Sequence, residues 1–213
     1  MIWARESLPS ISAIVAVTVL VSALVSLSRF ELDASILAGF VPARLSGLID
    51  YTGVIAVPAF LTPLSCALLH AGFLHLGMNM LILFVTAQPT EKVLGALPLV
   101  VLYIVGAYAA AAAQWLVDPA SVIPMIGASG AASAVVGAYS LLFGRSRAKA
   151  IGPIPAQAVH VIWLAAAWTA INLLSAFAFL NAGIGVAAAA HIGGFLVGLA
   201  LARPLLAWRW RGA

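Results

Sequence analysis

Six apolar segments alternate along this chain with short stretches rich in polar residues, glycine and proline. A helix that crosses a bilayer needs about 20 predominantly apolar residues. The second segment begins at residue 61 and is too long for one crossing, so its helix is predicted to start between residues 70 and 72 and to end at residue 87. The other predicted membrane helices cover residues 10–27, 97–117, 127–143, 158–180 and 185–206.

A secretory signal peptide is the alternative interpretation of the first segment. The segment is long for that purpose and five more apolar segments follow it, which favours a membrane helix.

The connections between these segments differ in character. The longest, residues 29–60, interleaves charged and apolar positions, a pattern typical of short helices lying in the headgroup region. After the second segment, Glu91 and Lys92 are predicted to mark a turn that Gly95 and Pro98 close.

The composition agrees with a protein that passes through the membrane several times. Hydrophobic residues make up 64% of the chain and charged residues 8%, against roughly 25% charged residues in soluble domains. The single cysteine, Cys66, excludes an intrachain disulfide and a cysteine-rich metal site. Four scattered histidines without acidic neighbours argue against bound zinc, so we expect no metal and no cofactor.

The formal charge of +4 reflects orientation in the membrane better than affinity for nucleic acid. Six crossings place both termini on one side, and eight of the ten basic residues fall on that side. Because cytoplasmic loops collect lysine and arginine, we predict cytoplasmic termini and no nucleic-acid partner. The eight are Arg5, Lys92, Arg145, Arg147, Lys149, Arg203, Arg209 and Arg211; Arg29 and Arg44 are the two on the outer side.

These patterns predict an all-α membrane protein, a bundle of six transmembrane helices embedded in the lipid bilayer. It forms a single domain over residues 1–213, with a core at about 60–202. Residues 29–60 form an outer interfacial loop, and residues 207–213 form a basic cytoplasmic tail.

Several polar side chains lie inside the apolar segments, where they are costly and therefore point to function. His75 and Asn79 lie early in the second segment, Ser129 at the start of the fourth, and His191 about two turns into the sixth. All three segments enter from the outer face, so these groups share one shallow depth. A serine, a histidine and further donors can serve as nucleophile, general base and oxyanion stabiliser.

Small residues favour the convergence of these helices. Gly194 and Gly198 follow His191 at helical spacing, and Ser129 begins a similar run that contains Ser133. Facing small residues let helix backbones approach closely, which would allow His191 to reach Ser129.

Each feature also has a purely structural explanation. A Gly-x-Ser-Gly sequence is common in membrane helices, and a lone histidine on an apolar helix is more often a packed, hydrogen-bonded side chain. His75 with Asn79 would then simply bridge two helices, and Cys66 would be a small buried hydrophobe. The joint depth of the polar groups on three segments favours the catalytic interpretation.

The order and spacing of these motifs resemble the rhomboid intramembrane serine proteases over roughly residues 60–202. The motifs are His70-x4-His75-x3-Asn79, Glu91-Lys92-x2-Gly95, Gly127-Ala128-Ser129-Gly130 and Ala190-His191-x2-Gly194-x3-Gly198.

The resemblance implies a rhomboid-like fold with a catalytic pair of Ser129 and His191. It also implies oxyanion contacts from His75, Asn79 and the Ser129 backbone amide. The resemblance further implies that five residues support the site: His70, Gly127, Gly130, Gly194 and Gly198. His70 would do so by holding the first outer loop.

Two departures from the family pattern stand out. Many members carry Trp-Arg in the first outer loop, where this chain has Leu61 and Thr62. Family members often place a tyrosine against the histidine ring one turn after the serine, and here that position is Ser133.

The function implied is an intramembrane serine endopeptidase that cleaves transmembrane protein substrates near the outer face by a Ser-His dyad, in a bacterial cytoplasmic membrane. The resemblance also implies that substrates arrive beside the fifth helix, with residues 181–185 as a cap. The alternatives are an inactive rhomboid-like binder of membrane proteins, which usually lacks the serine or histidine, and a proton-coupled transporter. A transporter would carry an intramembrane carboxylate, and none of the six acids is expected within a span.

Overall fold

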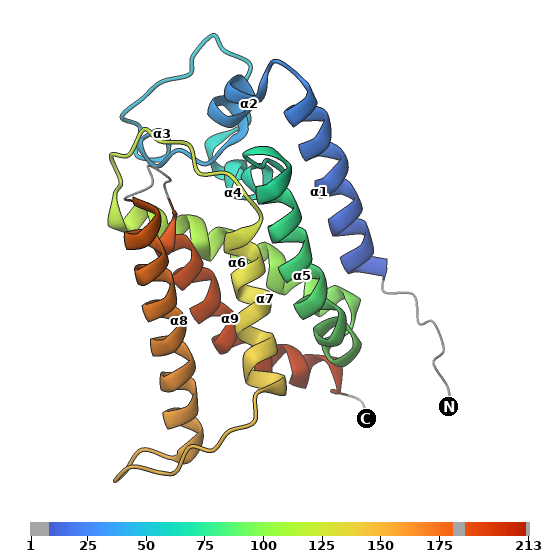
Figure 1. The fold of residues 1–213 in the computed structure, drawn as a ribbon, viewed down its shortest axis with the longest axis vertical. Coiled ribbons are helices and arrows are strands. Elements are labelled where there is room, and N and C mark those ends of the chain that lie inside the picture. Colours follow the sequence, from blue (N-terminus) through green and yellow to red (C-terminus); the bar gives the residue numbers. More distant parts are fainter. Residues whose placement is uncertain (1–8, 181–185, 212–213) are drawn as a thin grey trace.

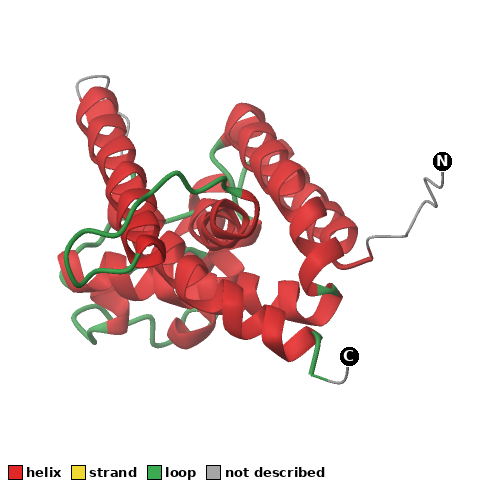
Figure 2. Ribbon diagram, turned by 90° about the horizontal axis from the view of Figure 1, so that it is seen from below, coloured by secondary structure: helices red, strands yellow, loops and turns green. Residues whose placement is uncertain are grey.

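The computed structural model describes residues 9–180 and 186–211, and in this part of the chain long helices form a bundle with no sheet (Figures 1 and 2). Within these described ranges, five helices are long and apolar enough to cross a membrane. A sixth, α7 (Ser129–Phe143), is apolar but has only 15 residues. The five long helices are α1 (Pro9–Leu27), α5 (Gly72–Leu94), α6 (Ala96–Val117), α8 (Ala156–Leu180) and α9 (Ala188–Arg209).

Short helices occupy the connection between α1 and α5 and gather at one end of the bundle, the upper end in Figure 1. The start of α1 and the end of α9 lie at the opposite end of the bundle (Figure 1). The short elements are α2 (Glu31–Ala38), α3 (Pro42–Leu45), η1 (Ala59–Leu61), α4 (Thr62–Ser65) and η2 (Cys66–Leu68).

Three predicted features fall outside the described residues. They are Arg5, one of the basic residues predicted on the cytoplasmic side, the implied cap at residues 181–185, and residues 212–213 of the predicted tail.

The short helix α7 lies at the centre of the bundle, packed against α5, α6 and α9 (Figure 1). Its small side chains make this possible, because the neighbouring backbones come too close for larger ones. A Cβ added at Gly137 would lie 2.4 Å from the carbonyl oxygen of Phe195 in α9. Helix α8 stands at the edge of the bundle and contacts α9 more than α7.

The predicted turn at Glu91 and Lys92 is wrong. Helix α5 continues through Pro89 to Leu94, and the chain turns at Gly95, whose φ is 88°. The first amides of a helix lack partners within it, and the Glu91 carboxylate accepts bonds from the backbone amides of Ser10 at 3.2 Å and Ile11 at 3.1 Å. Glu91 therefore lies within α5 and caps the start of α1.

Glu91 also corrects the expectation that no acid lies within a predicted span. Its side chain is 3% exposed and sits in the last turn of α5. The carboxylate is engaged at the α1 terminus, where it also accepts a hydrogen bond from the Ser10 hydroxyl. This contact joins the start of α1 to the last turn of α5, at the end of the bundle opposite α2–α4.

Other helix ends differ by a few residues from the prediction. Pro98 lies in the first turn of α6, where the missing amide hydrogen costs nothing because first-turn amides have no intrahelical partner. Helix α9 begins at Ala188, so His191 lies in its first turn and not two turns in, and the helix continues past Pro204 to Arg209.

Candidate active site

The side chains of Ser129 and His191 meet where α7 and α9 begin. Ser129 Oγ lies 2.8 Å from His191 Nε2. The two helices come together at glycines: a Cβ at Gly194 would lie 2.1 Å from the Gly130 carbonyl oxygen. One at Gly198 would lie 2.0 Å from the Ala134 carbonyl oxygen. Neither position has room for a side chain, and this close approach brings the imidazole to the hydroxyl.

The loop before Ser129 is held by segments that precede α5. Phe40 and Met125 exchange two backbone hydrogen bonds of 3.0 and 2.8 Å. The Gly127 amide donates to the Cys66 carbonyl at 2.9 Å, and Gly127 adopts φ 118°, which favours glycine. The loop that presents the serine is therefore bonded at Met125 to the segment between α2 and α3, and at Gly127 to η2.

His70 adds a side-chain bond to this loop. Its Nε2 accepts from the Ala128 amide at 3.2 Å, and its Nδ1 lies 2.8 Å from Ser22 Oγ in α1. An amide only donates, so Nε2 is unprotonated and Nδ1 carries the hydrogen, which it donates to Ser22. The Ser22 hydroxyl donates in turn to the Leu68 carbonyl at 2.7 Å. His70 thus links α1, the loop before α5 and the serine loop.

Burial keeps His70 neutral. Its side chain is 1% exposed, and desolvation, with a smaller contribution from nearby His75, lowers the pKa of His70 to about 4. Burial likewise raises the pKa of the Cys66 thiol to about 12, so Cys66 is an unreactive thiol.

His75 and Asn79 lie on one face of the first turns of α5. The Ala71 amide donates to His75 Nδ1 at 3.2 Å, so the hydrogen of the neutral ring is on Nε2. That atom faces the serine loop: a Cβ built on Gly127 would lie 3.1 Å from His75 Nε2 and 3.7 Å from Ser129 Oγ. Asn79 is buried, and its Nδ2 donates to the His75 carbonyl at 2.9 Å.

Sequence reasoning missed two residues of α8 that touch His191. Asn172 Oδ1 lies 2.8 Å from His191 Nδ1, and Trp168 Nε1 donates to the His191 carbonyl at 3.1 Å. The Trp168 ring also stacks on Phe195 of α9 with centroids 4.8 Å apart. An asparagine in an apolar segment is the same kind of signal that singled out Asn79, and it was available at residue 172.

The two departures from the family pattern have local roles. Ser133 Oγ donates to the Ser129 carbonyl at 2.7 Å, so it satisfies the helix backbone and leaves the ring of His191 to other neighbours. Thr62 is 2% exposed and donates to the Ala59 carbonyl at 2.6 Å. Leu61 is 38% exposed on the same short segment.

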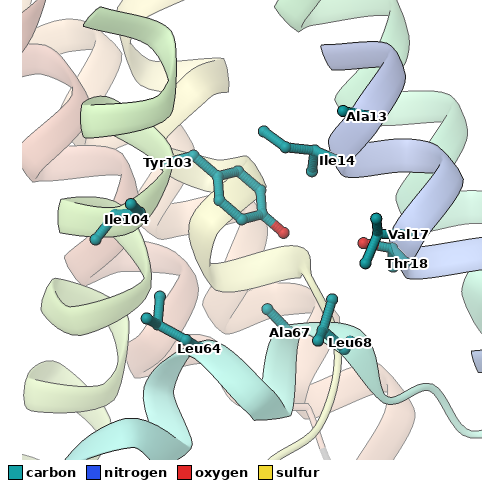
Figure 3. Close-up of a pocket in the computed structure, with 9 residues that line it drawn as sticks. All are labelled: Ala13, Ile14, Val17, Thr18, Leu64, Ala67, Leu68, Tyr103 and Ile104. Atoms are coloured by element: carbon teal, nitrogen blue, oxygen red, sulfur yellow. The ribbon is translucent and has the colours of Figure 1, made fainter. Parts of the chain in front are cut away.

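A cavity of about 340 Å³ lies apart from these residues, between α1, the α4–η2 segment and α6 (Figure 3). Its walls are almost entirely apolar, with Ile14, Leu64 and Ile104 among them. The hydroxyls of Thr18 and Tyr103 are buried beside it without a hydrogen-bond partner among the described residues. The cavity offers no chemistry related to Ser129.

The site residues are not arranged to bind a metal. Among the described residues, no group of three or more histidine, cysteine, aspartate or glutamate side chains could hold an ion. The partner of His191 Nδ1 is an amide, and Asp118, the acid nearest in sequence before α7, is exposed at the end of α6.

Known proteins resemble this chain over much of its length. A family model described as the Rhomboid domain matches residues 58–208. Rhomboid protein 1, mitochondrial, from Saccharomyces cerevisiae is 33% identical over 135 residues, which is 61% of this chain and 37% of that protein. The chain therefore spans little more than a third of that relative's length.

Proposed function

Because the chain belongs to the rhomboid family, we propose that it is an intramembrane serine endopeptidase that cleaves transmembrane segments of other membrane proteins near the outer face of the bilayer. Ser129 is the nucleophile and His191 the general base. The observation that carries the proposal is the 2.8 Å contact between Ser129 Oγ and His191 Nε2. At this separation a base can remove the hydroxyl proton.

The reaction follows from these two groups. Ser129 Oγ attacks the scissile carbonyl carbon while His191 Nε2 takes its proton, and the carbonyl oxygen becomes an oxyanion. The C–N bond then breaks as the imidazolium returns the proton to the leaving amine. Water hydrolyses the acyl-enzyme with His191 again as base. His75, Asn79 and the Ser129 backbone amide are the proposed oxyanion donors.

The length of α7 supports a site below the membrane surface. Its 15 residues extend about 22 Å at 1.5 Å per residue, whereas the hydrocarbon core is about 30 Å thick. If the helix ends at the inner surface, Ser129 lies several ångströms below the outer one. Water then reaches it from the outer side, and a substrate helix must unwind there, because its amides are otherwise bonded within the helix.

The same proposal includes the membrane arrangement. The protein is a multi-pass integral membrane protein, and we assign six crossings to it, with α7 as the short one and both termini cytoplasmic. The excess of basic residues on that side supports this orientation. Residues 1–213 act as one domain, with 29–60 as the outer interfacial loop and 207–213 as the basic tail, in a bacterial cytoplasmic membrane. The mechanism uses no cofactor or metal.

Labelling with a fluorophosphonate tests the proposal directly. Wild-type protein in membranes should react at Ser129, whereas Ser129→Ala and His191→Ala should neither react nor cleave a reporter transmembrane substrate. Ser133→Ala is the matched control, because among the described residues its hydroxyl donates only to the Ser129 carbonyl on the same helix. Unlabelled wild-type protein that still binds membrane proteins would favour the inactive rhomboid-like binder instead.

A further inference from the structure

We propose that Asn172 is a positioning residue for the reaction, so that the working unit is Ser129–His191–Asn172. The inference rests on the proposed function. Asn172 lies on α8, the least buried of the five long helices, yet its own side chain is 6% exposed. Its neighbours Ile171 and Leu173 are 57% and 56% exposed and point away from the bundle. Among residues 171–173, the buried side chain is the polar one, Asn172, and it faces His191.

The orientation of the Asn172 amide follows from its two partners. A backbone carbonyl can only accept, and the carbonyl of Trp168 lies 2.9 Å from Asn172 Nδ2. The NH₂ group of Asn172 therefore points toward the Trp168 carbonyl, one helical turn earlier in α8. The oxygen Oδ1 is then left facing His191 Nδ1 at 2.8 Å.

This orientation sets the tautomer of His191. Since Oδ1 only accepts, Nδ1 must carry the hydrogen. A neutral imidazole carries one ring hydrogen, so Nε2 has a free lone pair toward Ser129 Oγ, 2.8 Å away. In the other tautomer Nε2 would carry the hydrogen and could not accept the serine proton. Asn172 thus holds the ring in the one form that can act as a base.

An amide performs only part of the role that a carboxylate has in a serine protease triad. A carboxylate orients the imidazole and also stabilises the imidazolium formed during attack. Asn172 orients the ring without placing a charge inside the membrane, where a charge is costly. An aspartate at position 172 cannot donate to the Trp168 carbonyl, but its carboxylate should still accept from His191 Nδ1 and add a charge that stabilises the imidazolium.

Helix α8 contacts residue 191 at a second point, which offers a way to separate orientation from packing. Trp168 bonds the His191 backbone carbonyl and stacks on Phe195, whereas Asn172 Oδ1 faces the imidazole Nδ1. If Asn172 served only to pack α8 on α9, its loss would act on stability and substrate binding. If it orients the ring, its loss acts on kcat and on the pH profile.

The experiment compares Asn172→Ala, Asn172→Asp, Ile171→Ala and Ser129→Ala by kcat and KM for a reporter transmembrane substrate between pH 5 and pH 9. Asn172→Ala should lower kcat about 10²-fold, the size of loss that small misplacements produce, with KM unchanged. Asn172→Asp should recover most of kcat and move the acid limb of the profile to higher pH, because a carboxylate stabilises the imidazolium. Ile171→Ala, on the lipid-facing side, should match the wild type.

Two outcomes would overturn the inference. One is a wild-type kcat in folded Asn172→Ala. The other is an equal loss in Asn172→Asp with an unmoved acid limb, which would mean that the residue only packs. The aspartate variant decides the question if the alanine variant does not fold. Cleavage by Ser129→Ala would instead remove the proposed function, so the two failures are distinguishable.

Discussion

The backbone amide of Ala128, next to Ser129, donates a hydrogen bond to Nε2 of the buried His70 at 3.2 Å. The position of the serine loop therefore depends on a histidine that must remain unprotonated. Protonation would place a second hydrogen on His70, at Nε2, against the Ala128 N–H and remove this bond.

This relationship predicts a loss of stability in acid. The pKa of His70 is lowered to about 4, from about 6.5 for a histidine in an unfolded chain. Between these values the unfolded state binds more protons, so the stabilising contribution is complete above about pH 6.5 and declines as the pH falls toward 4. Thermal unfolding of wild type and His70→Gln at pH 7.5 and pH 5 should show a smaller pH dependence in the variant. Equal pH dependence in the two proteins would contradict the assignment.

Gly198→Val should separate α7 from α9. An added Cβ would lie 2.0 Å from the Ala134 carbonyl oxygen, so the backbones must move apart and lengthen the Ser129–His191 contact. A displacement of this kind can lower activity about 10²-fold. Gly77→Val is the matched control, since nothing lies within 4 Å of a Cβ there. Full cleavage by membrane-inserted Gly198→Val would show that the contact is not needed.

His75→Ala should lower kcat by up to about 10²–10³-fold if the ring donates to the oxyanion. Asn79→Ala should also lower kcat, by removing a donor and by releasing the His75 carbonyl, which Asn79 bonds at 2.9 Å. The steady-state kcat of both variants and of the double variant checks this, because the remaining donors partly compensate in the single variants. An unchanged kcat in the double variant would exclude both residues from the site.

Tyr103→Phe should not weaken the fold. The Tyr103 hydroxyl is buried without a partner among the described residues, and removing an unsatisfied buried group should stabilise by about 1 kcal/mol. Ser22→Ala provides the contrast, because it removes a hydroxyl bonded to both Leu68 and His70. Thermal unfolding should therefore rank Tyr103→Phe at or above wild type and Ser22→Ala below it. The reverse order would contradict both hydrogen-bond assignments.

Reporter fusions test the orientation. Fusions after Lys149 and after Ala213 should report the cytoplasm, and a fusion within residues 33–50 should report the outer side. We expect this because the basic residues are in excess on the predicted cytoplasmic side. A cytoplasmic result for residues 33–50 would place Ser129 and His191 toward the wrong compartment for the proposed reaction.

Much of the fold was accessible from hydrophobicity alone, because burying backbone amides in lipid forces long apolar segments into helices. The ends of α1, α6 and α8 lie within two residues of the predicted ones. The depth of the polar groups along the sequence predicted that Ser129, His191, His75 and Asn79 lie near one another. Depth in a membrane is a one-dimensional quantity, and it can be counted along a sequence.

Rotation of helices about their axes and contacts between distant segments were decided only in three dimensions. Glu91 looked like a turn residue because its partners, the first amides of α1, lie some 80 positions earlier in the chain. The sequence did not predict a role for Asn172, because the role of a neutral amide in an apolar segment depends on its hydrogen-bond partner. That it faces His191 Nδ1 depends on the packing of α8 against α9, a relationship that no local spacing in the sequence encodes.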